Sequence, residues 1–123
     1  MESMEPNPTW DPAAHSETVD ALEAAVGDVT YHVWGADWCG DCRAVLPDFS
    51  AALNAAAIPH RAVEVHEVDR EKDGELVAEY DVTHIPTIVV EQGDEELARF
   101  EESEPLPAAE HVARELLDAD GFA

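Results

Sequence analysis

The sequence predicts an α/β fold, with a central mixed β-sheet of four to five strands flanked by helices on both faces. Helical and strand-like segments alternate along most of the chain, and strand–helix–strand units imply parallel strands with right-handed crossovers. Near the C-terminus a glycine turn separates two strand-like runs, which predicts an antiparallel hairpin at one edge of the sheet. The 123 residues, 46% of them hydrophobic, suit one domain with its own core.

The N-terminal part of the chain divides into a tail and a helix. Residues 1–10 are acidic and contain prolines, so we expect a mobile tail, with the folded domain over 11–123. Asp11 can act as an N-cap, Pro12 suits the first helical position, and apolar residues at helical spacing follow. Gly27 is a natural stop for this helix. No strand pattern precedes it unless the tail supplies one.

A strand and a long helix come next. Residues 29–34 are rich in β-branched and aromatic side chains, which favours a strand. An apolar stripe at helical spacing predicts a helix over about 40–56, which Ile58 and Pro59 end. Pro47 lies inside this pattern and is expected to kink the helix, because its ring clashes with the carbonyl four residues earlier.

The second half of the chain supplies the remaining strands and two helices. Charged and apolar residues alternate over 61–68, which predicts a strand, and a short helix is expected over 74–80. The apolar run 87–90 suits a buried strand, and beyond a turn at Gly93 residues 96–100 form its antiparallel partner. The last helix starts near Leu106, and its apolar stripe is made of Ala109, Val112, Ala113, Leu116 and Leu117.

The charge of the chain is extreme. Asp and Glu number 29 against 6 Lys and Arg, which gives a formal net charge of −23. Such a chain repels nucleic acids and anionic lipid surfaces, so we exclude both as partners. The acids are spread through the whole chain, a pattern typical of proteins from a salty cytoplasm, whose folding needs salt to screen the charges. The alternative is a surface matched to a basic partner.

The compartment follows from what the sequence lacks. No apolar run approaches the roughly 20 residues of a membrane helix, and the acidic N-terminus has neither the basic nor the apolar region of a secretory signal. We therefore expect a cytoplasmic monomer without a membrane partner. The two cysteines form one C-x-x-C motif. In a reducing compartment this motif is more typical of redox activity or metal binding than of a structural disulfide.

The segment that carries chemistry is Trp38-Cys39-Gly40-Asp41-Cys42, at the predicted junction of a strand and a helix. A helix N-terminus has unpaired N–H groups and about half a positive charge, and both stabilise a thiolate. The thiolate is the species that attacks a disulfide. We therefore expect Cys39 to be the exposed nucleophile and Cys42, one turn inside the helix, to be buried and to resolve the mixed disulfide.

With these residues the chain resembles the thioredoxin family over roughly residues 28–118. The matching pieces are Trp38-Cys39-x-x-Cys42, Pro47, Ile85-Pro86-Thr87, the Gly93 turn and the C-terminal helix. The resemblance implies a thioredoxin-like fold in which the bond before Pro86 is cis and the proline packs against the two sulfurs. There it would keep a strand edge open for a substrate backbone and block metal from the dithiol. The plainer interpretation of Pro86 is a proline at the start of a strand.

Two residues near the motif differ from the common family pattern. Asp41 stands where many thioredoxins have proline. Beside the thiols its carboxylate would disfavour the thiolate and make the disulfide less oxidising; alternatively it points to water and does little. His84 lies two residues before Pro86, where the family usually has a small residue. It can act as a proton shuttle or tune Cys39, or it is an ordinary surface histidine.

This chain lacks two charged residues that are usual in the thioredoxin family, and it has extra acidic residues after the hairpin. The buried acid that helps to move protons at the second cysteine would fall at Val33, and its lysine neighbour near Val65. Proton transfer from Cys42 must then use water or another group. After the hairpin, the groove is acidic where the family usually presents a glycine, at Glu101, Glu102 and Glu104.

From the motif and the resemblance we expect an enzyme of cell redox homeostasis: a thiol–disulfide oxidoreductase of the protein-disulfide reductase type. Cys39 and Cys42 are its catalytic residues, and the residues expected to bind substrate or tune the thiols are Trp38, Gly40, Asp41, His84, Ile85 and Pro86. No bound cofactor is expected beyond the redox-active disulfide. The expected partners are disulfide-containing proteins or small thiols, and a reductase or thiol that donates electrons.

Two alternatives belong to other classes. One is a redox-inactive adaptor that keeps the fold for docking, against which the intact cysteine pair argues. The other is a metal module built from Cys39, Cys42 and two histidines. Structural zinc prefers four closely placed ligands, and no second ligand pair shows such spacing, so we predict no metal site. His32 and His66 alternate with apolar residues on predicted strands and receive no role.

Overall fold

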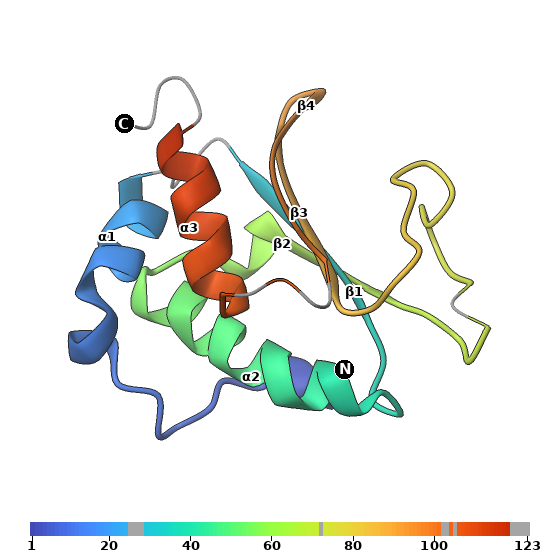
Figure 1. Ribbon diagram of the computed structural model, residues 1–123, viewed down its shortest axis with the longest axis horizontal. Coiled ribbons are helices and arrows are strands. Elements are labelled where there is room, and N and C mark those ends of the chain that lie inside the picture. Colours follow the sequence, from blue (N-terminus) through green and yellow to red (C-terminus); the bar gives the residue numbers. More distant parts are fainter. Residues whose placement is uncertain (25–28, 72, 102–103, 105, 119–123) are drawn as a thin grey trace.

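The computed structural model describes residues 1–24, 29–71, 73–101, 104 and 106–118, and its centre is a four-stranded mixed sheet in the order β2-β1-β3-β4 (Figure 1). The strands are β1 (Thr30–Gly35), β2 (Val63–Glu67), β3 (Thr87–Gln92) and β4 (Glu95–Glu101). β1 pairs parallel with β2 and antiparallel with β3, and β3 pairs antiparallel with β4. The mixed sheet and its C-terminal hairpin are therefore confirmed.

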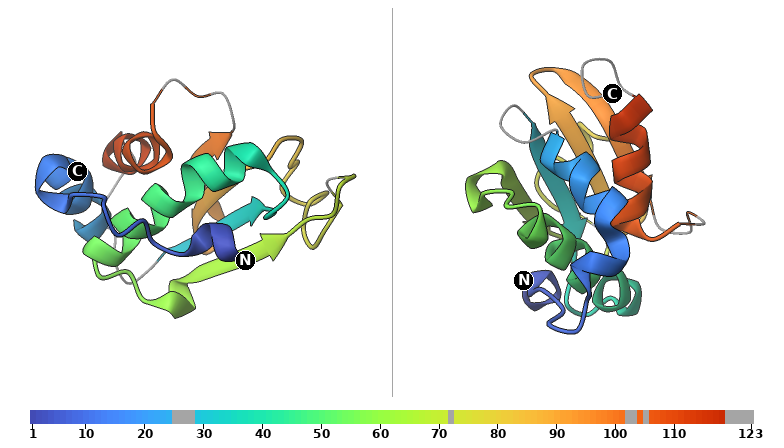
Figure 2. Two further views of the ribbon diagram at one scale, coloured as in Figure 1. Left: turned by 90° about the horizontal axis from the view of Figure 1, so that it is seen from below. Right: turned by 90° about the vertical axis from the view of Figure 1, so that its left-hand side faces the viewer.

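Three helices gather on one side of the sheet (Figures 1 and 2). They are α1 (Ser16–Ala24), α2 (Gly40–Ala55) and α3 (Ala108–Asp118), and each contacts the other two. Tyr31 of β1 packs on Phe49 of α2, and Phe100 of β4 meets the His111 ring of α3 edge-on. Helices thus flank the sheet on this side. No helix in the described part of the chain has the length and apolar character needed to cross a membrane.

In the part of the chain that the structure describes, turns cover the opposite face of the sheet. His32 and Trp34 of β1 lie against Tyr80, with ring centroids 5.0 and 5.1 Å apart, respectively. The short helix predicted over 74–80 is wrong, because this segment consists of consecutive turns. Leu76 has a left-handed backbone (φ 65°), which interrupts a helix, and so few residues cannot sustain one alone. Among the described residues, α-helices therefore cover one face and turns the other, so the prediction of helices on both faces is corrected.

The N-terminal tail lies against α2 (Figure 2). The backbone N–H and the hydroxyl of buried Ser3 both donate to the Asp37 carboxylate at 2.9 Å. Ser50 of α2 donates to the Met4 carbonyl at 2.6 Å. The expectation of a mobile tail over 1–10 is therefore corrected: its polar groups have partners far along the chain, which composition does not reveal.

The signals at helix ends are largely reproduced. Asp11 accepts a hydrogen bond from the Ala13 N–H, and a short 3₁₀ helix over Pro12–His15 leads into α1. The stop predicted at Gly27 lies outside the described residues. α2 continues through Pro47.

Helix α3 contacts β4 and binds the backbone of Arg99 at its outer edge. The backbone N–H of Arg99 donates to Glu115 at 2.7 Å, and Nε2 of His111 donates to the Arg99 carbonyl at 2.7 Å. At Arg99 these side chains take the place of a neighbouring strand and pair the two backbone groups of that residue.

The core contains a hydroxyl without a partner, and it provides a test of the packing. Tyr31 is fully buried, burial raises its pKa, and its Oη has no hydrogen-bond partner among the described residues. An unpaired buried hydroxyl costs on the order of 1–3 kcal/mol. Tyr31→Phe keeps the ring on Phe49, so we expect about 1 kcal/mol of stabilisation in urea unfolding at high salt. A clear loss of stability would instead reveal a hydrogen bond made by this hydroxyl.

Candidate active site

The cysteine motif lies where β1 ends and α2 begins. Cys39 is the N-cap of α2, with extended backbone (φ −90°, ψ 120°), and its sulfur accepts a hydrogen bond from the backbone N–H of Cys42 at 3.3 Å. The sulfur occupies the position of a capping oxygen, facing the free N–H groups and the positive end of the helix dipole. This environment favours negative charge on sulfur.

Cys42 lies one turn further along and is fully buried, whereas Cys39 is partly exposed. The Cys42 sulfur sits against Gly35 at the end of β1: a Cβ at Gly35 would lie only 3.2 Å from that sulfur. Burial above all, then Cys39, raises the pKa of Cys42 to about 12. Cys42 therefore remains a thiol near neutral pH, and the pair has the exposed and buried members expected from the sequence.

The turn before the cysteines is held from two sides. The Asp37 carboxylate accepts hydrogen bonds from the N–H groups of Ser3 and Glu2, at 2.9 and 3.1 Å, which hold its pKa below the usual range. On the other side the Arg43 guanidinium donates to the Asp37 carbonyl at 2.6 Å. The N-terminal segment, to which sequence reasoning gave no role, therefore positions the turn that leads to Cys39.

The other motif residues surround the thiols at the surface. The indole N–H of Trp38 donates to the Val68 carbonyl at 3.3 Å, and the Arg70 guanidinium lies 5.4 Å from the centroid of the Trp38 ring. Gly40 and Asp41 are exposed, and no atom lies within 4 Å of a Cβ built at Gly40. Asp41 is exposed, yet its charge also contributes to the raised pKa of Cys42, so both interpretations of Asp41 stay open.

The segment before β3 reaches the same end of the sheet. The Ile85–Pro86 bond is cis, and Pro86 is buried. Trp34 is paired with Thr87 in the register of β1 and β3, so Pro86, just before Thr87, lies toward the end of β1 that leads to the cysteines. The packing of Pro86 against the two sulfurs stays a prediction.

His84 is placed differently. Its side chain is exposed, and its Nδ1 lies 3.0 Å from the Thr83 hydroxyl. Among the described residues, hydrogen bonds connect His84 to Thr83 and Thr87 and not to a cysteine. Its role as a proton shuttle or as a group that tunes Cys39 stays a prediction.

Comparison with known proteins decides the family. A family model described as thioredoxin matches residues 14–114. The chain belongs to the thioredoxin family. It is 30% identical over 73 residues to a protein disulfide-isomerase of Drosophila melanogaster, which covers 58% of this chain but 15% of that protein. The chain thus spans a small part of the curated relatives that it matches.

Solved structures show that the thioredoxin-like fold is correct. A mutant thioredoxin of Halobacterium salinarum has a TM-score of 0.51 at 21% identity, over 81% of this chain and 80% of that one. A second structure has a TM-score of 0.52 at 17% identity, over 81% of this chain and 86% of that one. It comes from work on the thiol resolving mechanism of a yeast mitochondrial 1-Cys peroxiredoxin via glutathione and thioredoxin systems. At these identities the likeness concerns the fold.

The thioredoxin-family position of the buried acid is apolar in this chain. Val33 is fully buried in β1 on the helix side of the sheet, beside Ile88 of β3. Val65, at the position of the lysine neighbour, is 41% exposed. Any group that takes a proton from Cys42 in this thioredoxin-family chain must therefore be water or a side chain from elsewhere.

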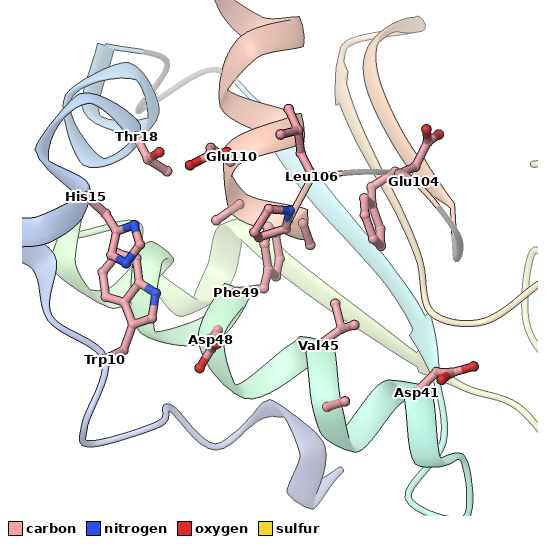
Figure 3. Close-up of a pocket in the computed structure, with 15 residues that line it drawn as sticks. Trp10, His15, Thr18, Asp41, Val45, Asp48, Phe49, Glu104, Leu106 and Glu110 are labelled. Carbon is pink, nitrogen blue, oxygen red and sulfur yellow. The ribbon is translucent and has the colours of Figure 1, made fainter.

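A cavity of about 410 Å³ opens next to the thioredoxin motif (Figure 3). Its floor on α2 is Val45 and Phe49, and Asp41 lies at one end. At the other end the rings of Trp10 and His15 stack with centroids 4.6 Å apart. The cysteines do not line this cavity, so it lies beside the thiols and not over them.

Proposed function

We propose that this chain is a thiol–disulfide oxidoreductase that reduces protein or low-molecular-weight disulfides through Cys39 and Cys42. The observation that carries the proposal is the Cys39 sulfur at the N-cap of α2, with the buried Cys42 thiol one turn behind it. Membership of the thioredoxin family and the likeness to a protein disulfide-isomerase support the same chemistry.

The reaction divides into two exchanges. The Cys39 thiolate attacks one sulfur of the substrate disulfide, so that a mixed disulfide forms and the other substrate sulfur leaves as a thiolate. Cys42 then loses its proton and attacks the Cys39 sulfur, which releases the second substrate thiol and closes the Cys39–Cys42 disulfide. Two electrons pass to the substrate. An electron-donating reductase or a low-molecular-weight thiol returns them and restores both thiols.

The geometry favours this division of roles. Cys39 meets the substrate because it is partly exposed and because a helix N–H stabilises its negative charge. Cys42 stays protonated and enclosed until the mixed disulfide brings an electrophilic sulfur to it. With Val33 in place of an acid, the proton of Cys42 leaves through water or another group.

The acidity of the chain belongs to the same proposal. With 29 acidic against 6 basic side chains, we propose a salt-rich cytoplasm as its setting. The negative surface would favour basic protein substrates over acidic ones, through steering that salt weakens.

The reduction potential of the Cys39–Cys42 couple tests the direction of electron flow. We expect a value near the roughly −270 mV of thioredoxin, measured in high salt by equilibration with glutathione or dithiothreitol. A value above about −200 mV, in the range of isomerising and oxidising proteins, would overturn the reductase assignment but keep the exchange chemistry. Failure to form a reversible disulfide would favour the adaptor.

A further inference from the structure

Two buried histidines meet on the face of the sheet that α2 does not cover. His32 of β1 is 3% exposed and His66 of β2 is 8% exposed. Nδ1 of His32 lies 3.0 Å from Nε2 of His66, and the rings stack at 5.3 Å between centroids. Trp34 packs on both rings, at 5.7 and 4.9 Å. Sequence reasoning gave neither histidine a role.

A carboxylate completes a group of three donors. Oε2 of Glu64 lies 3.3 Å from Nδ1 of His32, and the donor atoms of His32, Glu64 and His66 all lie within 4.8 Å of one another. Glu64 is the neighbour of His32 in the parallel register of β1 and β2. Two imidazole nitrogens and one carboxylate oxygen are a donor set that divalent transition metals prefer.

The spacing of these donors fits one small ion. Zinc binds imidazole nitrogen at about 2.0–2.1 Å in tetrahedral geometry, so two ligand atoms of one ion lie about 3.3 Å apart. The nitrogen–nitrogen distance of 3.0 Å and the nitrogen–oxygen distance of 3.3 Å are close to this ligand–ligand separation. Two of the three donor–donor distances thus match one small ion, and the third is no longer than 4.8 Å.

Outer partners orient the first histidine toward this point. Nε2 of His32 lies 2.9 Å from Oε1 of Glu91, and the Tyr80 hydroxyl donates to the same oxygen at 2.7 Å. A carboxylate only accepts, so Nε2 of His32 carries the proton and Nδ1 presents its lone pair to His66 and Glu64. A carboxylate behind a histidine is the usual second partner of a metal ligand.

His66 also faces a carboxylate, and the site can be reached from solvent. Nδ1 of His66 points to Glu75, with Oε1 at 3.9 Å. The Glu64 side chain is 56% exposed, and β2 is an outer strand of the sheet, so an ion can reach the site from solvent.

We propose that Nδ1 of His32, Nε2 of His66 and the Glu64 carboxylate bind one divalent transition-metal ion of the zinc class, with solvent in the remaining position. The site lies on the sheet face opposite the helix that carries the cysteines, and it is independent of the proposed redox function.

Zinc binding tests the proposal in a background without thiol ligands. Cys39→Ala/Cys42→Ala protein is titrated with zinc in high salt against a chromogenic chelator, with the unmodified chain in parallel. We expect one tight equivalent. Glu64→Gln and His66→Gln each weaken it by tenfold or more, and Glu91→Gln by about 10–100-fold through the second partner. Cobalt in the same site gives the visible absorption of a tetrahedral nitrogen–oxygen complex.

Matched controls separate this site from diffuse binding to an acidic surface. Asp69, Glu71 and Asp73 form an exposed acidic cluster, so Asp69→Asn removes one negative charge, as Glu64→Gln does, without touching the histidines. His60→Gln removes an exposed histidine. Neither control is expected to change the affinity. Should His66→Gln fail to fold, exposed Glu64→Gln still decides. Equal affinity in Glu64→Gln and the background, or an equal loss in the acidic control, overturns the proposal.

Discussion

Replacing Cys39 with serine is expected to lower disulfide reduction on the order of 10³-fold or more, because it removes the covalent nucleophile. The serine hydroxyl can still cap α2, as Cys39 does when its sulfur accepts from the Cys42 N–H, so the fold should persist. The measurement is turnover of a chromogenic aryl disulfide with dithiothreitol as electron donor. Circular dichroism in high salt confirms that the variant is folded.

Cys42→Ser is the matched partner variant. It keeps the nucleophile but removes the resolving thiol, so the first exchange proceeds and the mixed disulfide accumulates on Cys39. Mass spectrometry should find one aryl thiol per chain on Cys42→Ser and none on Cys39→Ser. An adaptor would bind its partners equally well in both variants and trap nothing. Equal trapping by both variants would contradict the assigned order of attack.

The resolving step is expected to accelerate about tenfold per pH unit from neutrality to pH 9 and beyond. The pKa of Cys42 is raised to about 12, first by burial and then by Cys39. A raised pKa means that little thiolate is present at neutral pH, and below the pKa the thiolate fraction grows tenfold with each unit. The step that consumes this thiolate should follow the same slope.

Rapid mixing with an aryl disulfide separates the two exchanges. Attack by Cys39 releases the first aryl thiolate, and attack by Cys42 releases the second, so the slower absorbance phase reports the resolving step. Cys42→Ser should show the first phase alone at every pH. A second phase that becomes independent of pH near pH 8 would mean that a neighbouring group removes the Cys42 proton, and His84 would be the first residue to replace.

Features that depend on a few neighbouring residues could be predicted from the sequence. The Asp11 cap, the Gly93 turn between the two C-terminal strands and the position of Cys39 at the start of α2 all follow from local chemistry. The prediction over 74–80 failed because Leu76 adopts a left-handed backbone, which nothing in its own chemistry favours. Packing of Tyr80 on the sheet outweighs local preference there.

Contacts that depend on strand register could not be predicted from the sequence. His32 and His66 are 34 positions apart, and they meet because Tyr31 pairs with Val63 in the parallel register of β1 and β2. A shift of one residue would turn one of the two histidines toward the helices, since neighbouring side chains on a strand point to opposite faces. The alternation of histidines on two predicted strands was visible, but the pairing that joins them was not.

The two outer strands of the sheet differ in how readily they can join a second copy of this protein. Glu115 and His111 occupy the backbone groups of Arg99, whereas β2 has no neighbour on its outer side among the described residues. An unpaired strand edge can join a second copy edge to edge. Strand addition is therefore favoured at β2 over the part of β4 around Arg99, and joining two copies through β2 covers the β2 edge of both. Exposed Glu64 and Glu67 on β2 repel their counterparts in such a pair, so acidic conditions would be needed to bring the two edges together.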